Sequence, residues 1–273
     1  MKTIRRLESE VRSYSRSFPV LFEKAKDAFL FDADGNRYID FFAGAGTLNY
    51  GHNNDHMKKK LIEYLETDGI VHGLDMATVA KEELLLKMES IVFKPRNLDY
   101  KIQFTGPTGT NAVEAGLKLA RMVKKRSNVI SFTNGYHGLT MGSMSVTANA
   151  YYRDEAFINR SDVSFLPYDG YLGKDVNTAQ YMRRFLEDGS SGVDIPSAVI
   201  LETVQGEGGI RVASDEWLRE VESICREFDI LLMVDDIQVG NGRTGHFFSF
   251  ERSGIKPDIV TVSKSFSGYG LPM

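Results

Sequence analysis

The sequence predicts an α/β fold with a mostly parallel sheet and flanking helices. From about residue 56, short apolar runs alternate with segments whose apolar residues repeat at helical spacing. Polar or glycine-rich residues follow several of these apolar runs. Such alternation is typical of parallel sheets, which bind ligands beyond the carboxyl ends of their strands. A chain of 273 residues with 42% hydrophobic residues is long enough to bury one substantial core.

The N-terminal part of the chain differs from the rest. Residues 28–40 place Asp34 and Gly35 between two runs of strand-forming residues, which predicts a β-hairpin. We therefore expect an N-terminal segment, residues 1–55, that contributes to a small domain, and a large domain, residues 56–273.

The other elements follow in order along the large domain. Helical spacing predicts helices at residues 77–92, 111–124 and 215–228. Apolar runs predict strands at residues 101–105, 129–132, 163–166, 198–201, 230–235 and 259–262. Ser214 is the expected N-cap of the last helix, and Asn111 with Glu114 matches a capping box at the start of the second.

A lysine and an aspartate lie at the ends of two predicted strands. Asp235 ends the strand at 230–235, and Lys264 follows the strand at 259–262. This pair suits pyridoxal phosphate (PLP), because a lysine can hold its aldehyde as a Schiff base and a carboxylate can keep its pyridine nitrogen protonated. The pattern therefore predicts a PLP enzyme with Lys264 and Asp235 as the catalytic residues.

A turn rich in glycine and hydroxyl groups precedes the helix at 111–124. Residues 106–111, here called the phosphate turn, offer an anion their backbone N–H groups, the hydroxyls of Thr108 and Thr110, and the positive end of the helix dipole. By itself the turn fits an ordinary strand-to-helix connection equally well. The lysine and the aspartate favour the phosphate site.

Two further polar segments follow predicted strands. Tyr136 and His137 follow one strand, where an aromatic ring can stack on a cofactor, although such a pair alone more often serves packing. Glu202 and Glu207 follow another predicted strand, in a glycine-rich stretch. Carboxylates at strand ends are often simply solvated, so this pattern fits a solvated surface as well as a functional site.

Composition and motifs argue against other classes of protein. A net charge of −4 with scattered basic residues excludes a strongly basic nucleic-acid surface. The chain has one cysteine and no apolar run near the roughly 20 residues of a membrane span. Its first residues lack an apolar stretch, so we expect no signal peptide. We therefore expect a cytoplasmic protein. The five histidines lack metal-ligand spacing, and the G-x-G-x-x-G at 240–245 does not join a strand to a helix, so neither a metal nor a dinucleotide site is expected.

Five motifs together resemble the class III aminotransferases of PLP fold type I. They are Thr-Gly-Thr-Asn-Ala-Val-Glu-Ala at 108–115, Tyr-His-Gly at 136–138, Glu-Thr-Val-Gln-Gly-Glu-Gly-Gly at 202–209, Asp-Asp-Ile-Gln-Val-Gly-Asn-Gly-Arg-Thr-Gly at 235–245 and Ser-Lys-Ser at 263–265. The resemblance covers essentially the whole chain from Phe29 onward. It implies PLP as cofactor, amino acid and 2-oxo acid substrates, and a homodimer or higher homo-oligomer.

The resemblance also implies roles for individual residues. Lys264 is expected to form the Schiff base, and Asp235 to pair with the pyridine nitrogen. Glu207 matches a carboxylate that pairs with a C-terminal arginine in relatives. The other residues expected at the cofactor are Thr108, Gly109, Thr110, Tyr136, His137, Glu202 and Gln238, with Tyr136 stacked on the ring and Gln238 bonded to its hydroxyl.

Within the family, the chain resembles the transaminases that act on 2,4-diaminobutyrate and 2-oxoglutarate in ectoine synthesis. The alternatives are a 4-aminobutyrate or ornithine type of omega-transaminase, an aminomutase, or a non-catalytic protein with this fold. Leu139 stands where many relatives carry a carboxylate-binding arginine, which argues against a 4-aminobutyrate or ornithine site, and Thr203 replaces a common proline. Because relatives continue beyond Met273, we expect the small C-terminal domain to be missing.

Overall fold

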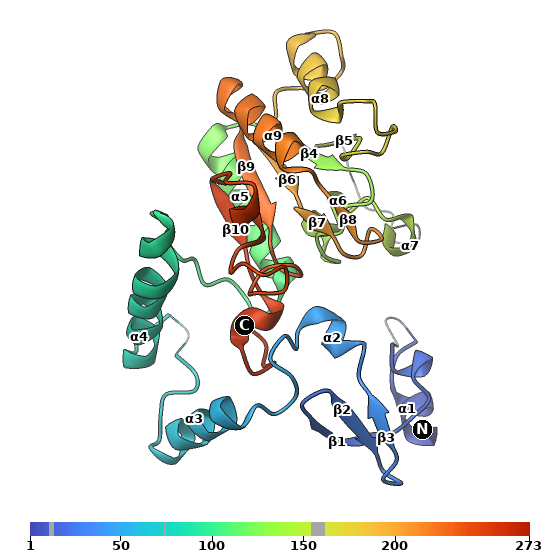
Figure 1. Cartoon of the computed structure of the whole chain (residues 1–273), viewed down its shortest axis with the longest axis vertical. Helices are drawn as coiled ribbons and strands as arrows, with labels where there is room; N and C mark the ends of the chain where they lie inside the picture. Colours follow the sequence, from blue (N-terminus) through green and yellow to red (C-terminus); the bar gives the residue numbers. More distant parts are fainter. Residues whose placement is uncertain (11–13, 74, 154–161) are drawn as a thin grey trace. The chain divides into compact units, whose positions relative to one another are not determined.

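The structure, a computed structural model, describes residues 1–10, 14–73, 75–153 and 162–273 (Figure 1). It divides into two compact units, Met1–Val71 with Gly268–Gly270, and His72–Ser267 with Leu271–Met273. The first unit extends past the boundary expected at residue 55, because it includes helix α3 (Asp55–Glu66). Its contribution to a small domain stays a prediction. Within the described ranges, no helix is both long and apolar enough to cross a membrane.

An antiparallel sheet lies at the centre of the first unit. Its strands are β1 (Phe22–Lys26), β2 (Phe29–Asp32) and β3 (Arg37–Ile39). The predicted hairpin is confirmed, because β2 and β3 pair antiparallel on either side of the turn. Asp32 Oδ1 stabilises that turn by accepting hydrogen bonds from the amides of Asp34 and Asn36, at 3.0 and 2.8 Å. The same unit contains helices α1 (Lys2–Leu7) and α2 (Ala43–Gly46) and a 3₁₀ helix at Tyr14–Ser17.

A five-stranded sheet with strand order β10-β9-β6-β4-β5 lies at the centre of the second unit (Figure 1). Every pairing in it is parallel, which confirms the predicted sheet. Each of these strands begins and ends within one residue of its prediction: β4 (Val129–Phe132), β5 (Val163–Leu166), β6 (Ala198–Leu201), β9 (Leu231–Asp235) and β10 (Ile259–Thr261). A short antiparallel pair, β7 (Val204–Gln205) and β8 (Arg211–Val212), follows β6.

Helices pack on both faces of this sheet. One buried cluster joins α5 (Gly109–Lys124) to Val129, Ile200 and Met233 of the sheet. The residues next to these three in the strands belong instead to a larger cluster with α9 (Asp215–Glu227). Successive side chains of a strand point to opposite faces, so burial of both sets means that the sheet is covered twice. The other α-helices described in this unit are α4 (Val79–Lys87), α6 (Met141–Ser145), α7 (Ala150–Arg153) and α8 (Thr178–Glu187).

The starts of two helices test the predicted caps. Ser214 precedes α9 and its hydroxyl accepts a hydrogen bond from the amide of Trp217 at 3.3 Å, as expected of an N-cap. Helix α5 begins earlier than predicted, so Thr108 is its N-cap and accepts from the amide of Asn111 at 3.4 Å. The predicted capping box of Asn111 and Glu114 is wrong, because these residues lie inside the helix.

The strand predicted at residues 101–105 is also wrong. These residues are extended but belong to no sheet of the described chain. They line a cavity of about 220 Å³ together with residues of α5 and β10. Alternating apolar residues indicate an extended, half-buried chain, but they do not determine whether a neighbouring strand pairs with its backbone. The helix predicted at 77–92 ends differently as well, since α4 passes into a π-helical turn at Met88–Phe93.

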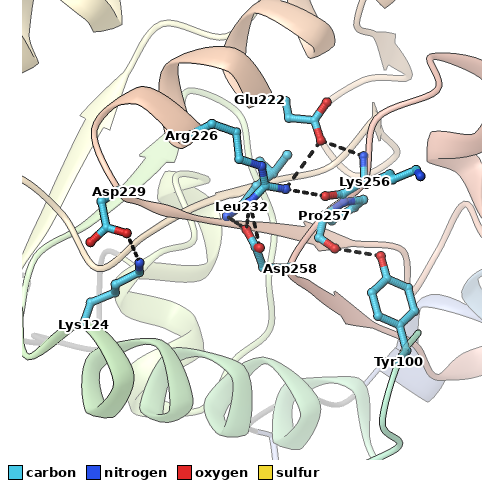
Figure 2. Close-up of polar contacts among 9 residues, drawn as sticks. All are labelled: Tyr100, Lys124, Glu222, Arg226, Asp229, Leu232, Lys256, Pro257 and Asp258. Atoms are coloured by element: carbon cyan, nitrogen blue, oxygen red, sulfur yellow. Dashed lines mark hydrogen bonds and ion pairs between the residues drawn. The ribbon is translucent and has the colours of Figure 1, made fainter. Parts of the chain in front are cut away.

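Polar contacts fix the amino ends of β9 and β10 (Figure 2). Arg226 of α9 donates to both carboxylate oxygens of Asp258 at 2.7 Å, and Asp258 Oδ2 accepts from the amide of Leu232 at 2.8 Å. Tyr100 donates its hydroxyl hydrogen to the carbonyl of Pro257 at 2.7 Å. Because Asp258 precedes β10 and Leu232 lies in β9, these bonds hold the two strands in register. Their opposite ends carry Asp235 and Lys264.

Candidate active site

The carboxyl ends of four neighbouring strands bring most of the predicted site residues to one edge of the sheet. Lys264 follows β10, Asp235 ends β9, Glu202 follows β6, and Tyr136 and His137 follow β4. Parallel strands end at the same edge, so residues far apart in the sequence meet there. The edge is therefore the candidate active site.

Asp235 is a buried carboxylate with hydrogen bonds at both oxygens. The residue is only 4% exposed. His137 Nδ1 lies 2.8 Å from Oδ2, while the hydroxyl of Thr261 and the amide of Ile237 donate to Oδ1 at 3.0 and 3.3 Å. These bonds fix the orientation of the carboxylate and offset part of the cost of burying its charge. Thr261, which no sequence motif indicated as a site residue, lies directly opposite Asp235 in the β9–β10 register.

Asp236 has other partners than Asp235. Its carboxylate accepts hydrogen bonds from the amide and the hydroxyl of Ser249. The hydroxyl of Thr203 is bonded to the same serine, which gives a structural reason for a threonine where relatives often carry proline. Burial raises the pKa of Asp236 to about 7. The two adjacent aspartates therefore face different surroundings, as strand alternation requires.

Lys264 has an unusual backbone conformation. Its φ is 50°, in the left-handed region that lysine rarely adopts, and it begins a 3₁₀ helix at Lys264–Ser267. Burial lowers the pKa of its amine, an effect that the neighbouring carboxyl groups of Glu207, Asp235 and Glu202 oppose. A strained residue that carries a half-buried amine is a common sign of a functional position.

Glu202 lies beside Asp235 in the interior. Burial, with the negative charge of Asp235 as a second cause, raises its pKa well above the ordinary value. Its Oε2 accepts a hydrogen bond from the amide of Tyr136 at 3.1 Å, so it fixes the loop that follows β4. The ring of Tyr136 lies against Tyr152, with 5.0 Å between the ring centroids and 58° between the planes.

Glu207 and Gln238 contact each other. Gln238 Nε2 donates to Glu207 Oε1 at 3.2 Å. The backbone of Gly206 lies close to the same glutamine, since a Cβ there would be 1.8 Å from Gln238 Oε1. The expected pairing of Glu207 with an arginine stays a prediction.

The phosphate turn lies against the end of β9. The first amides of a helix have no partner inside the helix, and in α5 they belong to Gly109, Thr110 and Asn111. A Cβ at Gly109 would be 2.8 Å from Cδ1 of Ile237, which follows Asp235 closely in the sequence. Glycine at this position therefore lets the amino end of α5 approach the buried carboxylate.

Comparisons with known proteins identify the family. Residues 11–273 match the family model for aminotransferase class III, so the chain belongs to the class III aminotransferases. Family membership implies pyridoxal phosphate as the cofactor.

One similar relative is the diaminobutyrate–2-oxoglutarate transaminase of Wolinella succinogenes, which is 67% identical over 273 residues. The match covers all of this chain but only 64% of the relative's length. Among solved structures, an aminotransferase of Bacillus anthracis is 26% identical with a TM-score of 0.86, and the match covers 99% of this chain and 62% of that one. The ornithine aminotransferase of Toxoplasma gondii, described with PLP at its active site, is 25% identical with a TM-score of 0.79 over 99% of this chain and 60% of that one. These likenesses confirm the predicted fold class.

The raised pKa of Asp236 predicts a pH dependence of stability. Its folded pKa of about 7 lies above the ordinary 3.8, so the folded state binds more protons than the unfolded state between these values. Its stabilising contribution is therefore present below pH 3.8 and lost as the pH rises through about 7. Asp236→Asn cannot ionise, so its urea midpoint should fall less than that of the wild type between about pH 5 and pH 8. Glu202, whose pKa is also raised, adds the same pH dependence to the wild type and to the variant. Urea midpoints that change equally with pH in the two proteins would contradict this assignment.

Proposed function

We propose that the protein is a PLP-dependent transaminase with its active site at the carboxyl edge of the sheet. One observation carries the proposal, namely that three groups lie around the ends of adjoining strands. They are the amine of Lys264, whose pKa is lowered, the buried and hydrogen-bonded carboxylate of Asp235, and the amino end of α5. Each suits a different part of PLP, namely its aldehyde, its pyridine nitrogen and its phosphate.

The residues present fit this cofactor chemically. Asp235 would hold the pyridine nitrogen, Lys264 the aldehyde carbon, and the amides of Gly109 and Thr110 the phosphate. Tyr136 would stack on the ring and Gln238 would bind its hydroxyl. Thr108, as the N-cap, shapes the phosphate turn, while His137 orients Asp235 and Glu202 fixes the loop that carries Tyr136.

Two residues would govern the movement of protons. Bound PLP supplies an electron sink that stabilises negative charge on the carbon bearing the substrate's amino group. Lys264 Nζ, once released from the cofactor, would take the proton from that carbon, and burial favours this role because it lowers the pKa of the amine. Asp235 would keep the pyridine nitrogen protonated, and the bonds from His137 and Thr261 hold its carboxylate in position.

We propose 2,4-diaminobutyrate and 2-oxoglutarate as the substrates, with aspartate 4-semialdehyde and glutamate as the products, in ectoine synthesis. The identity of 67% with a diaminobutyrate–2-oxoglutarate transaminase supports this choice. We further infer a homodimer, as the family resemblance implies, and a cytoplasmic location, with which the single cysteine agrees.

The choice of amine donor can be tested with the whole gene product. Glutamate formation from 2-oxoglutarate should be measured with 2,4-diaminobutyrate, ornithine and 4-aminobutyrate as donors. We expect kcat/KM for 2,4-diaminobutyrate to exceed the other two by roughly tenfold or more, since one methylene or one missing polar group changes binding by that order. Equal or higher values for ornithine or 4-aminobutyrate would assign the protein to the other transaminase type.

The covalent site can be located by mass spectrometry. Borohydride reduction of the PLP-loaded protein should leave a pyridoxyl group on the peptide that contains Lys264, because this is the lysine that follows β10 at the sheet edge. Lys118 of α5 and Lys256, before β10, are internal controls within the same digest. An adduct on either control in place of Lys264 would refute the assignment.

The two adjacent aspartates provide a matched pair of variants. Asp235→Asn should lower kcat by on the order of a thousandfold while PLP still binds, since a neutral amide does not keep the pyridine nitrogen protonated. Asp236→Asn makes the same substitution one residue further on and should have a much smaller effect, because its side chain faces Ser249. The reverse ranking in steady-state kinetics would exclude Asp235 as the pyridine partner.

A further inference from the structure

A carboxylate and three hydroxyls join the phosphate turn to the loop that follows β4. Glu114 of α5 reaches the start of α6, where its Oε1 accepts from the amides of Gly142 and Ser143 at 2.8 and 3.0 Å. The hydroxyl of Thr140 lies 2.5 Å from the same oxygen, and 2.8 Å from the hydroxyl of Thr110. Thr110 Oγ1 also contacts the hydroxyl of Ser143.

The direction of the hydrogen bonds follows from counting hydrogens. A carboxylate only accepts, so Thr140 must donate its single hydroxyl hydrogen to Glu114. Thr140 then has no hydrogen left for Thr110, so Thr110 donates in that pair. Thr110 has spent its own hydrogen on Thr140, so Ser143 donates in the bond between Ser143 and Thr110. The result is a chain from Thr110 through Thr140 to Glu114, in which each bond polarises the next.

Two glycines allow the close packing of this cluster. A Cβ at Gly138, which has a φ of 121°, would be 2.5 Å from Thr110 Oγ1. A Cβ at Gly142 would be 2.2 Å from Glu114 Oε2. Gly138 follows Tyr136 and His137, so the cluster connects the residues expected beside the cofactor ring to the residues expected at its phosphate.

We propose that Glu114 is a positioning residue that holds the phosphate turn through Thr140 and Thr110. The inference rests on the proposed function, in that the turn is taken to bind the phosphate of PLP. It also changes the role expected of Thr110. Because the hydroxyl hydrogen of Thr110 is directed to Thr140, Thr110 binds phosphate through its backbone amide and its side chain orients the turn.

Comparison of PLP with pyridoxal isolates the phosphate contribution. Both compounds carry the aldehyde and the ring, and only PLP carries the phosphate. Dissociation constants of both should be measured for the apo form of the whole gene product. Glu114→Ala should weaken PLP binding by roughly tenfold or more, the order expected when a charged hydrogen-bond partner is lost, while pyridoxal binding should change by less than about twofold.

A second variant keeps the test decisive if Glu114→Ala does not fold. Thr140→Val interrupts the chain but leaves Glu114 bonded to the two amides of α6, and it should weaken PLP binding selectively in the same way. Ser214→Ala is the matched control, because it removes a helix-starting hydroxyl from α9 and should affect neither ligand.

The outcomes separate this inference from the proposed function. Equal weakening of PLP and pyridoxal, or no weakening of either, in the variants would overturn the positioning role while the wild type still binds PLP at Lys264. A wild-type protein that binds neither ligand would refute the proposed function itself.

Discussion

A buried carboxyl group at the end of β9 is the constraint on which the rest of this site depends. A carboxylate placed in the interior requires hydrogen bonds or an opposite charge, since an unpaired buried charge is costly. His137 and Thr261 supply such bonds to Asp235 from the two sides, one from the loop after β4 and one from β10. The position of that carboxylate therefore ties together strands that are separated along the chain.

The covered sheet explains how adjacent residues acquire different roles. Because helices pack on both faces, the strands are mostly apolar, and the charged groups gather where the strands end. Asp235 and Asp236 lie at such an end and point to different sides, one towards the site and one towards Ser249. In a parallel sheet with helices on both faces, the functional side chains thus lie at one edge, and the side chains on the faces pack against the helices.

Much of this arrangement could be predicted from the sequence, and the failures have identifiable physical causes. Apolar runs located the five parallel strands, and the polar residues at their ends were therefore placed on one edge. Neither the isolation of residues 101–105 nor the contact of Thr261 with Asp235 could be foreseen, because both depend on which strands become neighbours and in what register. The sequence pattern predicted that Glu114 caps its own helix. Its partners lie instead at α6, more than twenty residues away along the chain. Local sequence patterns indicate contacts within a turn, whereas contacts such as those of Thr261 and Glu114 depend on how distant segments pair.

The parallel topology has a consequence for how the protein folds. Parallel neighbours cannot be joined by hairpins, so each pairing requires a long crossover to close before it gains stability. The candidate site draws residues from Thr108 to Lys264 and is complete only after these crossovers have formed. Chains of this kind fold slowly and expose unpaired strand edges while they do so, which makes them clients for chaperones. A ligand that needs all of these residues binds the native state alone, so its binding raises the free energy of unfolding by an amount that grows with the logarithm of its concentration relative to Kd.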